Sequence, residues 1–303
     1  MSTDRRLEIR GISKRYGQTV AVRDLSFDVR AGELFGFVGR NGAGKTTTMR
    51  MVLGVLSPDA GEVWWDGKPL DLESRRRIGY MPEERGLYPK MGLAEQLAYL
   101  GELHGMSDAE AHGSALRWLD RFGLKDRAGD DVQALSLGNQ QRIQLAAALV
   151  FGPDVLVLDE PFAGLDPVAV DVTADVLRER ANAGVPVIFS SHELELVERL
   201  CDRVGIVERG RMVACGTVAE LRAGGRERRW IDVPGASSDW DPGVAGTRLL
   251  QAAGTRRLFE LDPGVDDQAL LKAALKTGPV REFERVEPSL GEIFRSVIEE
   301  AAA

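Results

Sequence analysis

The sequence predicts an α/β fold in which a mostly parallel sheet carries helices on both faces. Three observations support this fold class. Short apolar runs alternate with helical segments along residues 1–222, as expected of strands joined by crossover helices. A glycine-rich loop at residues 39–46 lies between an apolar run and a helical segment. Residues 87–150 are helical, so we expect an inserted helical subdomain, together with an antiparallel β subdomain and a small α+β C-terminal domain.

The first predicted elements are short strands bounded by turn residues. Asp66 and Gly67 in "GEVWWDGKPL" are typical of a two-residue hairpin turn. In the helical segment that follows, Ser107 is a predicted N-cap because Glu110 stands three residues later. The predicted strands before that segment cover residues 7–9, 25–29 and 34–38, a hairpin over 61–70, and 77–81.

Strands and helices alternate again after residue 150. A predicted strand over 154–160 is followed by a helix over about 168–183 and a strand over 185–192. The sequence "RAGGRERR" then has the glycine and charge content of a linker. We therefore place a large domain over 1–222, a linker over 223–229 and a small domain over 230–303. The small domain has predicted strands at 230–233, 257–262 and 280–286 and predicted helices at 266–276 and about 289–300.

The composition is that of a globular protein with an acidic balance. Of the 303 residues, 44% are hydrophobic and 28% charged, and the net charge of −8 argues against nucleic acid as the main partner. Two cysteines, Cys201 and Cys215, are too few for a disulfide framework or a zinc site. No run approaches the roughly 18 apolar residues of a membrane span, and the N-terminus has no signal core. We expect a cytoplasmic protein that reaches a membrane only through another chain.

The sequence "GRNGAGKTTT" at 39–48 is a phosphate-binding loop. The strand before it and the helix after it distinguish it from a glycine-rich turn that binds nothing. Lys45 would reach the β- and γ-phosphates, and Thr46 would offer its hydroxyl to Mg²⁺. GTPases, kinases, helicases, recombinases and transport motors share such a loop, so it predicts the ligand and leaves the activity open. The predicted phosphate-binding residues are Gly39, Arg40, Asn41, Gly42, Ala43, Gly44, Lys45, Thr46 and Thr47.

A second motif, "LSLGNQQR" at 135–142, begins a predicted helix shortly before "DVLVLDEP". It resembles the signature motif of ATP-binding cassette (ABC) proteins, and the resemblance covers residues 7 to about 222 with each motif in order. The N-terminus of a helix is an anion site. In this family it faces the ATP of a second cassette, so the resemblance implies that Ser136, Gly138 and Gln140 contact a partner's nucleotide. A dimer is therefore expected, and we favour a homodimer over a heterodimer.

The same resemblance assigns roles at the ends of later strands. Asp159 is expected to hold Mg²⁺ together with Thr46, and Glu160 to polarise the attacking water as a general base. His192 matches the family's switch histidine and is counted with Glu160 and Lys45 as catalytic. The competing interpretation of the acidic pair is a helix cap or a surface turn, which the phosphate-binding loop disfavours.

Three further assignments depend on the resemblance. Asp166 in "AGLDP" is expected at the seam of the dimer. Tyr16 in "SKRYG" is expected to stack on adenine, with a strand-end ring packed on the sheet as the alternative. Glu83 in "PEERGLY" stands where the family has a glutamine, and its carboxylate is still a suitable ligand for Mg²⁺.

Two short sequence motifs indicate a particular subgroup of this family. "PEERGLY" and "VEPSLGEIF" at 286–294 are similar to strings in bacterial efflux cassettes related to sodium and drug exporters, which carry a small C-terminal domain. That domain is either a stabilising appendage or a regulatory or dimer-contact module. Both interpretations stay open at this point.

The resemblance implies an ATPase with ATP and Mg²⁺ as its cofactors. As the ATP-binding subunit of an ABC transporter, the chain would energise export of ions, drugs or another small molecule through a separate polytopic permease, on the cytoplasmic face of the membrane. The alternative is a soluble ABC ATPase of translation or DNA maintenance. Such proteins carry two cassettes or a long coiled coil, and this chain has neither. A non-catalytic binding module conflicts with Glu160 and His192.

Overall fold

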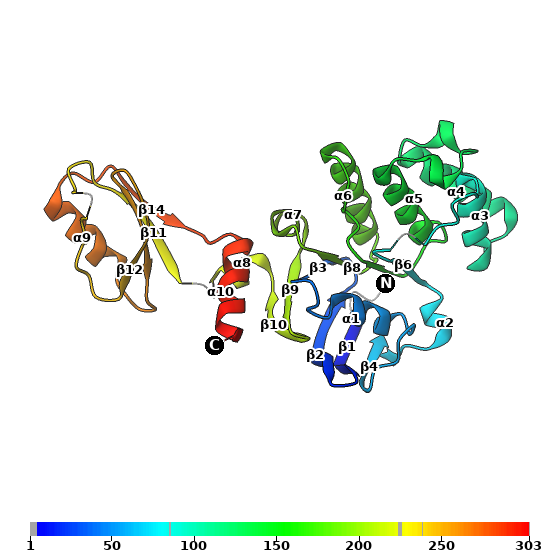
Figure 1. Cartoon of the computed structure of the whole chain (residues 1–303), viewed down its shortest axis with the longest axis horizontal. Helices are drawn as coiled ribbons and strands as arrows, with labels where there is room; N and C mark the ends of the chain where they lie inside the picture. Colours follow the sequence, from blue (N-terminus) through cyan, green and yellow to red (C-terminus); the bar gives the residue numbers. More distant parts are fainter. Residues whose placement is uncertain (1–4, 85, 224–225, 238, 303) are drawn as a thin grey trace. The chain divides into compact units, whose positions relative to one another are not determined.

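The computed structural model describes residues 5–84, 86–223, 226–237 and 239–302 of the chain. It divides into a large unit that runs to Thr217 and a small unit, Val218–Glu299. The large unit contains two β-sheets and the small unit contains a third (Figure 1). Among the described residues, no helix has the length and apolar character that crossing a lipid bilayer requires.

The six-stranded sheet of the large unit is mostly parallel. Its strand order is β10-β9-β3-β8-β7-β6, and the β9–β10 pair at one edge is antiparallel. All residues of β3 and β7 are buried, as expected of strands covered on both faces. The predicted fold class is therefore confirmed. The strands are β3 (Leu34–Gly39), β6 (Ile78–Met81), β7 (Val155–Leu158), β8 (Val187–Ser191), β9 (Arg203–Glu208) and β10 (Arg211–Gly216).

Helices cover both faces of this sheet. α1 (Lys45–Val52) packs against β3 on one face, and α6 (Pro167–Asn182) packs against β3 and β8 on the other (Figure 1). α7 (Leu194–Leu200) also packs against β3. A Cβ at Gly36 would lie 2.7 Å from Val197 Cγ1 of this helix. The glycine in "LFGFV" is therefore required by the close approach of α7 to the strand.

A second, antiparallel sheet packs against α1 through β2. Its strand order is β2-β1-β4-β5. Apolar side chains of both sheets and of α1 form one core cluster, which includes Leu7, Phe37 and Met49. The turn after β4 has φ angles of 51° at Asp66 and 76° at Gly67, so the predicted hairpin turn is confirmed. The elements are β1 (Arg6–Tyr16), β2 (Thr19–Arg30), β4 (Ala60–Trp65), β5 (Lys68–Pro69) and the short α2 (Leu72–Arg75).

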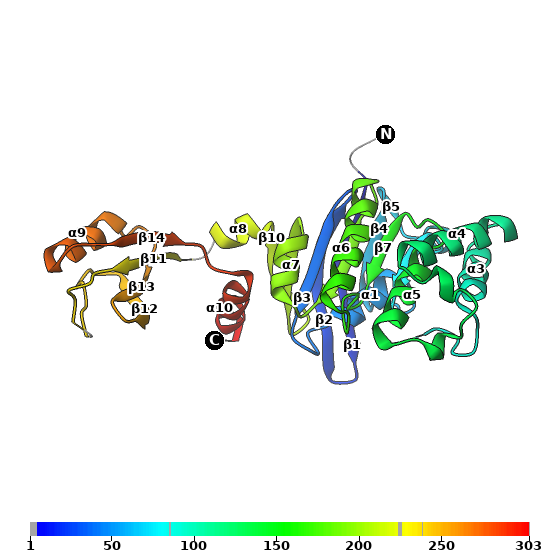
Figure 2. The ribbon, with the colours of Figure 1, turned by 90° about the horizontal axis from the view of Figure 1, so that it is seen from above.

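Three helices form the helical subdomain, and Figure 2 shows them together beside the sheet. α3 packs against α4, and both contact α5. The Ser107 backbone N–H donates to the Glu110 carboxylate at 3.0 Å, while the Ser107 hydroxyl accepts from the Glu110 backbone. The predicted N-cap is therefore confirmed as a capping box. The elements are α3 (Leu93–Leu103), α4 (Asp108–Arg121), the 3-10 turns η1 (Lys125–Arg127) and η2 (Val132–Ala134), and α5 (Leu137–Leu149).

The small unit is an antiparallel sheet backed by α9. Its strand order is β12-β13-β11-β14. The core is made by alternate residues of the central strands and one face of α9, including Ile231, Phe259 and Leu270. The elements are α8 (Val218–Ala223), β11 (Glu227–Asp232), β12 (Thr247–Ala253), β13 (Arg256–Leu261), α9 (Asp267–Thr277), β14 (Glu282–Val286) and α10 (Leu290–Ala302).

The small unit differs from the sequence predictions in three places. It begins at Val218, before the expected end of the large domain at residue 222, because α8 belongs to it. The expected linker over 223–229 is already strand from Glu227 onwards. The arginines of β11 interrupt the apolar alternation by which a strand is recognised in the sequence. Arg229, for example, is a buried strand residue that pairs with Asp267 at 2.7 Å. β12 was not predicted, because nearly all its residues are exposed and no alternation marks a buried face.

Asp267→Asn tests the contribution of the Arg229–Asp267 pair. Hydrogen bonds from the Arg229 guanidinium hold the pKa of the Asp267 carboxyl below its ordinary range. A lowered carboxyl pKa stabilises the folded state above the unfolded pKa, and that contribution is lost as pH falls through the folded pKa. At neutral pH, we expect the backbone amides of α9 to lose their hydrogen-exchange protection at a lower urea concentration in the variant than in the wild type. The variant and the wild type should converge in acid, and equal protection at neutral pH would contradict this role.

Candidate functional site

The glycine-rich loop connects β3 to α1. Gly42 and Gly44 have φ angles of 79° and 105°, a region that favours glycine. Neighbouring backbone also crowds the loop, since a Cβ at Gly39 would lie 2.4 Å from Val207 O and one at Gly44 would lie 2.6 Å from Ala21 O. These positions require glycine, and a tight curl of this kind is suited to present backbone N–H groups to an anion.

Lys45 opens α1 and its ammonium lies in this loop. Nζ donates to the carbonyl of Gly39 at 2.7 Å and to that of Arg40 at 3.3 Å, and the residue is 8% exposed. An ammonium at a helix N-terminus is a strong site for phosphate oxygens. Of the other residues predicted here, Gly39, Ala43 and Gly44 are buried, Thr46 and Thr47 are half-buried, and Arg40, Asn41 and Gly42 are exposed.

Asp159 directly follows β7 and is 1% exposed. The Ser190 hydroxyl of β8 donates to its Oδ1 at 2.5 Å. Within the described residues no donor reaches its Oδ2. A buried carboxylate oxygen without a partner is costly, and a hard dication would satisfy it. The residues present therefore fit Mg²⁺, with Asp159 and the Thr46 hydroxyl as the groups that would hold it.

The phenol of Tyr80 on β6 lies within the electrostatic influence of Asp159. Burial raises the pKa of its phenol, and the charge of Asp159 raises it further, while a hydrogen bond with Arg50 opposes the shift. The phenol therefore stays neutral at physiological pH. It leaves the carboxylate of Asp159 uncompensated, in agreement with a cation site.

Glu160 has a strained backbone, and hydrogen bonds hold both its backbone and its carboxylate. Its φ is 53°, in the left-handed region that costs a non-glycine residue about 1–3 kcal/mol and that occurs often at active sites. Its N–H donates to Ser190 Oγ at 2.8 Å, and its carbonyl accepts from Gln141 Nε2 at 2.9 Å. Its Oε2 accepts from His192 Nδ1 at 3.0 Å. The structure thus brings Glu160 and His192 together beside Asp159.

The signature residues lie at the start of α5. Ser136 is its N-cap, with Oγ 3.4 Å from the N–H of Asn139. A Cβ at Gly138 would come within 3.3 Å of Gly164 O, so the segment before Asp166 lies against this helix. Gln140 Nε2 donates to the carbonyls of Leu135 at 3.1 Å and Val132 at 3.3 Å, so its amide shapes the turn before the helix, and its contact with a partner's nucleotide stays a prediction.

Asp166, Tyr16 and Glu83 occupy exposed positions. Asp166 caps α6 by accepting from the Ala169 N–H at 2.8 Å, and its carboxylate lies 3.8 Å from Arg142 Nη2 on α5. Tyr16 is 51% exposed at the end of β1, with its ring accessible for stacking. Glu83 is exposed in the loop after β6. The positions of all three are compatible with their predicted roles, which stay predictions.

Three polar residues of the site were missed by the sequence reasoning. Ser190 forms hydrogen bonds with both Asp159 and Glu160. The sequence feature that could have identified it is a hydroxyl at the end of an apolar strand, in "VIFSSH". Gln141 and Gln144 stand three residues apart on α5 and are buried. The sequence feature that could have identified them is a pair of amides in a helix whose other buried residues are apolar.

Ser190→Ala should lower the rate of ATP hydrolysis. The change removes the donor to Asp159 and the acceptor of the Glu160 N–H, so both carboxylates lose their orientation. Misplacement of a catalytic group by about 1 Å can cost roughly 100-fold. We expect a fall of kcat by about 10- to 100-fold with little change of KM, measured by phosphate release. The neighbouring Ser191→Ala is the control, and an equal fall in that variant would contradict a specific role of Ser190.

Comparisons with known proteins agree with this site. The family described as "ABC transporter" matches residues 22–163, and that described as "ATP-binding protein DrrA1-3-like, C-terminal domain" matches residues 216–298. An uncharacterized ABC transporter ATP-binding protein, YhaQ of Bacillus subtilis (strain 168), is 39% identical over 298 residues, 95% of this chain and 97% of that protein. The linearmycin resistance ATP-binding protein LnrL of the same organism is 38% identical over 268 residues, 87% of this chain and 85% of that protein.

A solved structure described as the ATP-binding subunit of an ABC transporter is 32% identical, with a TM-score of 0.67 over 72% of this chain and 92% of the other. This protein belongs to the ATP-binding proteins of ABC transporters, P-loop enzymes that bind and hydrolyse ATP. Its small unit is a DrrA-like C-terminal domain.

Proposed function

We propose that this chain powers export of a small molecule or an ion through a separate polytopic membrane permease, as one half of a head-to-tail pair of cassettes. One observation carries the proposal: the chain presents a phosphate loop beside the Asp159–Glu160–His192 group and, at Ser136, a second helix N-terminus suited to an anion. A single chain offers both halves of a site for ATP, and two copies would complete two such sites.

The chain's own groups divide the work of hydrolysis. The loop N–H groups and Lys45 bind the β- and γ-phosphates. Thr46 and Asp159 would hold Mg²⁺, which when bound neutralises charge on the phosphate oxygens. Glu160 accepts a proton from the water whose oxygen attacks the γ-phosphorus, while the bond to the bridging oxygen of ADP breaks. His192 fixes the Glu160 carboxylate by donating to its Oε2.

Three residues would act across the dimer. Ser136 and Gly138 would contact the γ-phosphate bound to the partner cassette, and Asp166 would lie at the seam. Gln140 would support this segment through its bonds to the preceding turn. Loss of the γ-phosphate then removes the link between the two chains. Reversing a two-state equilibrium from 1:99 to 99:1 takes about 5.5 kcal/mol, within reach of several charge-assisted hydrogen bonds.

The remaining assignments follow the same proposal. Tyr16 stacks on adenine, and Glu83 is a Mg²⁺ ligand on the loop that faces the permease. We favour a homodimer over a heterodimer, bound peripherally at the cytoplasmic face of the membrane. Export is supported by the name of LnrL, a linearmycin resistance protein, and by the DrrA-like domain.

Co-purification tests the permease. The tagged chain is extracted in mild detergent, and the proteins that accompany it are identified. We expect one polytopic membrane protein, which stimulates ATP hydrolysis when both are reconstituted into liposomes. Stimulation by ribosomes or DNA, without any membrane protein, would contradict the transport proposal and favour a soluble ABC ATPase.

A further inference from the structure

Two buried amides lie on one face of α5. Gln141 is 6% exposed and Gln144 is 3% exposed. Residues three apart face the same side of a helix, so both side chains point towards the same neighbours. Helix α5 begins at the signature residue Ser136, and a displacement of this helix would move both amides together.

Gln141 holds the catalytic glutamate by its backbone. Its Nε2 donates to the Glu160 carbonyl at 2.9 Å, while Ser190 Oγ accepts from the Glu160 N–H at 2.8 Å. Both sides of this residue are therefore fixed by side chains. A left-handed φ of 53° persists only where the surroundings enforce it, and these two side-chain contacts contribute to that enforcement, together with the Ala163 backbone N–H, which also donates to the Glu160 carbonyl at 3.1 Å.

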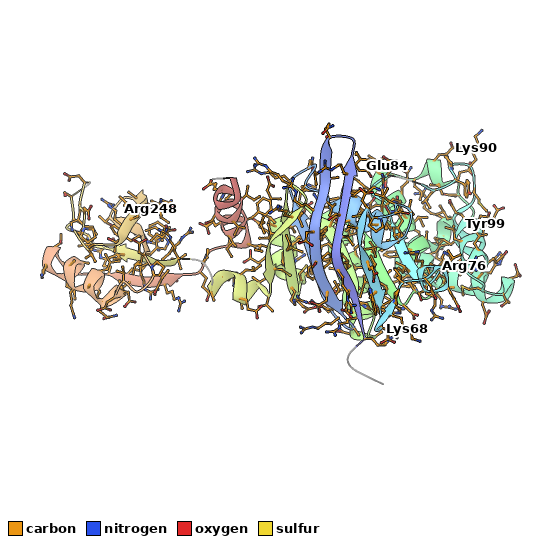
Figure 3. All side chains as sticks on the ribbon, turned by 90° about the horizontal axis from the view of Figure 1, so that it is seen from below. Lys68, Arg76, Glu84, Lys90, Tyr99 and Arg248 are labelled. Atoms are coloured by element: carbon orange, nitrogen blue, oxygen red, sulfur yellow. The ribbon has the colours of Figure 1, made fainter. Side chains whose placement is uncertain are left out.

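Gln144 holds the loop that carries Glu83. Its Nε2 donates to the carbonyl of Pro82 at 2.5 Å and to that of Glu84 at 3.2 Å, on both sides of Glu83. Figure 3 labels Glu84 in this loop. Within the described residues, Gln144 Oε1 is buried and has no partner. A buried amide that leaves its own oxygen unsatisfied is a poor choice for stability alone, which favours a role in placing the loop.

We propose that Gln141 and Gln144 are positioning residues that couple the signature end of α5 to Glu160 and to the Glu83 loop of the same chain. The inference rests on the proposed function, in which the signature end binds the partner's ATP. Binding of the partner's ATP would fix the position of α5. The hydrogen bonds of the two amides would then fix the positions of the Glu160 backbone and of the Glu83 loop. Each site would then hydrolyse ATP only after the other site has closed.

A double-mutant cycle tests the role of Gln141. Gln141→Leu should lower kcat by about 100-fold at nearly unchanged KM, as expected for a displaced catalytic group. In the Glu160→Gln background, the same change should lower the residual rate less than about twofold, because Gln141 acts through Glu160. The ATP-dependent dimer of that background should form as before. Additive effects on the rate, or loss of the dimer, would reduce Gln141 to a structural residue and overturn the proposal.

The corresponding cycle pairs Gln144→Leu with Glu83→Ala. Each single variant should lower kcat, and the double variant should resemble Glu83→Ala within about twofold. Two results would contradict action through the loop. One is a double variant whose loss of kcat is the product of the two single losses, and the other is a lower kcat in Gln144→Leu when kcat of Glu83→Ala is unchanged. If Gln144→Leu is not folded, Gln144→Met, which keeps the volume and lacks the donor, replaces it in the cycle.

Ser114→Ala is the matched control for both cycles. It removes another buried hydrogen bond to backbone, from Ser114 Oγ to Val150 O at 2.6 Å, just beyond the other end of α5. We expect its kcat to stay within about twofold of wild type, and an equal fall would show that any loss in this subdomain lowers activity. Failure of the proposed function is distinguishable, because Glu160→Gln alone would then form no ATP-dependent dimer, before Gln141 or Gln144 is changed.

Discussion

Glu160→Gln should keep ATP binding and lower the rate of hydrolysis by about 10²–10⁴-fold, the usual contribution of a general base. An amide has the same shape as the carboxylate but accepts no proton from the attacking water. The hydrogen bond with His192, at 3.0 Å to Oε2, and the backbone contacts of Glu160 can all persist in the variant. We therefore expect the variant to retain the geometry of the site and to lose only the proton transfer.

The ATP-bound state should accumulate in this variant. Since the γ-phosphate is not removed, the two cassettes should stay joined, and size-exclusion chromatography with ATP and Mg²⁺ should detect a dimer. Glu195→Gln, at an exposed carboxylate on α7, is the control and should behave as wild type. Wild-type turnover in Glu160→Gln would remove Glu160 as the base.

Lys45→Ala should weaken ATP binding by about 10²–10⁴-fold. A hydrogen bond to a charged group contributes about 1.5–3 kcal/mol, and Lys45 would donate to two phosphates. The loss is measured directly by titration calorimetry with ATP and Mg²⁺. Hydrolysis at low ATP concentration should fall by at least the same factor.

The control for this variant is a lysine outside the site. Lys68, labelled in Figure 3, is exposed on β5, and Lys68→Ala should bind ATP as wild type does. Because Lys45 also donates to the Gly39 carbonyl, the unfolding temperature of Lys45→Ala must be compared with that of the wild type. ATP affinity unchanged in a folded Lys45→Ala protein would contradict the assignment of the loop.

The sequence alone predicts those parts of the fold and of the site in which a single local cause determines each residue. Gly39 and Gly44 are fixed by backbone that leaves no room for a Cβ, so their spacing with Lys45 predicts a loop of one shape. The apolar strands of the central sheet are buried on both faces, and the alternation with helices predicts their parallel order. The capping box at Ser107 is equally local.

Contacts between distant segments could not be predicted in the same way. Ser190 meets Asp159 and Glu160 only because β8 lies beside β7 in the sheet. Gln144 meets the Pro82 carbonyl 62 residues away, and a single sequence gives no sign of that pairing. The strand β12 was missed for another reason, since an exposed edge strand has no buried face to impose a pattern.

The specific activity of the purified wild-type chain, measured over a series of protein concentrations, tests the central claim that each ATP is bound between two chains. At saturating ATP and Mg²⁺ the activity per chain should rise with concentration, and in the most dilute samples the rate should follow the square of the concentration. Sedimentation should find monomers where activity vanishes. Full activity per chain at concentrations where only monomers sediment would contradict the account.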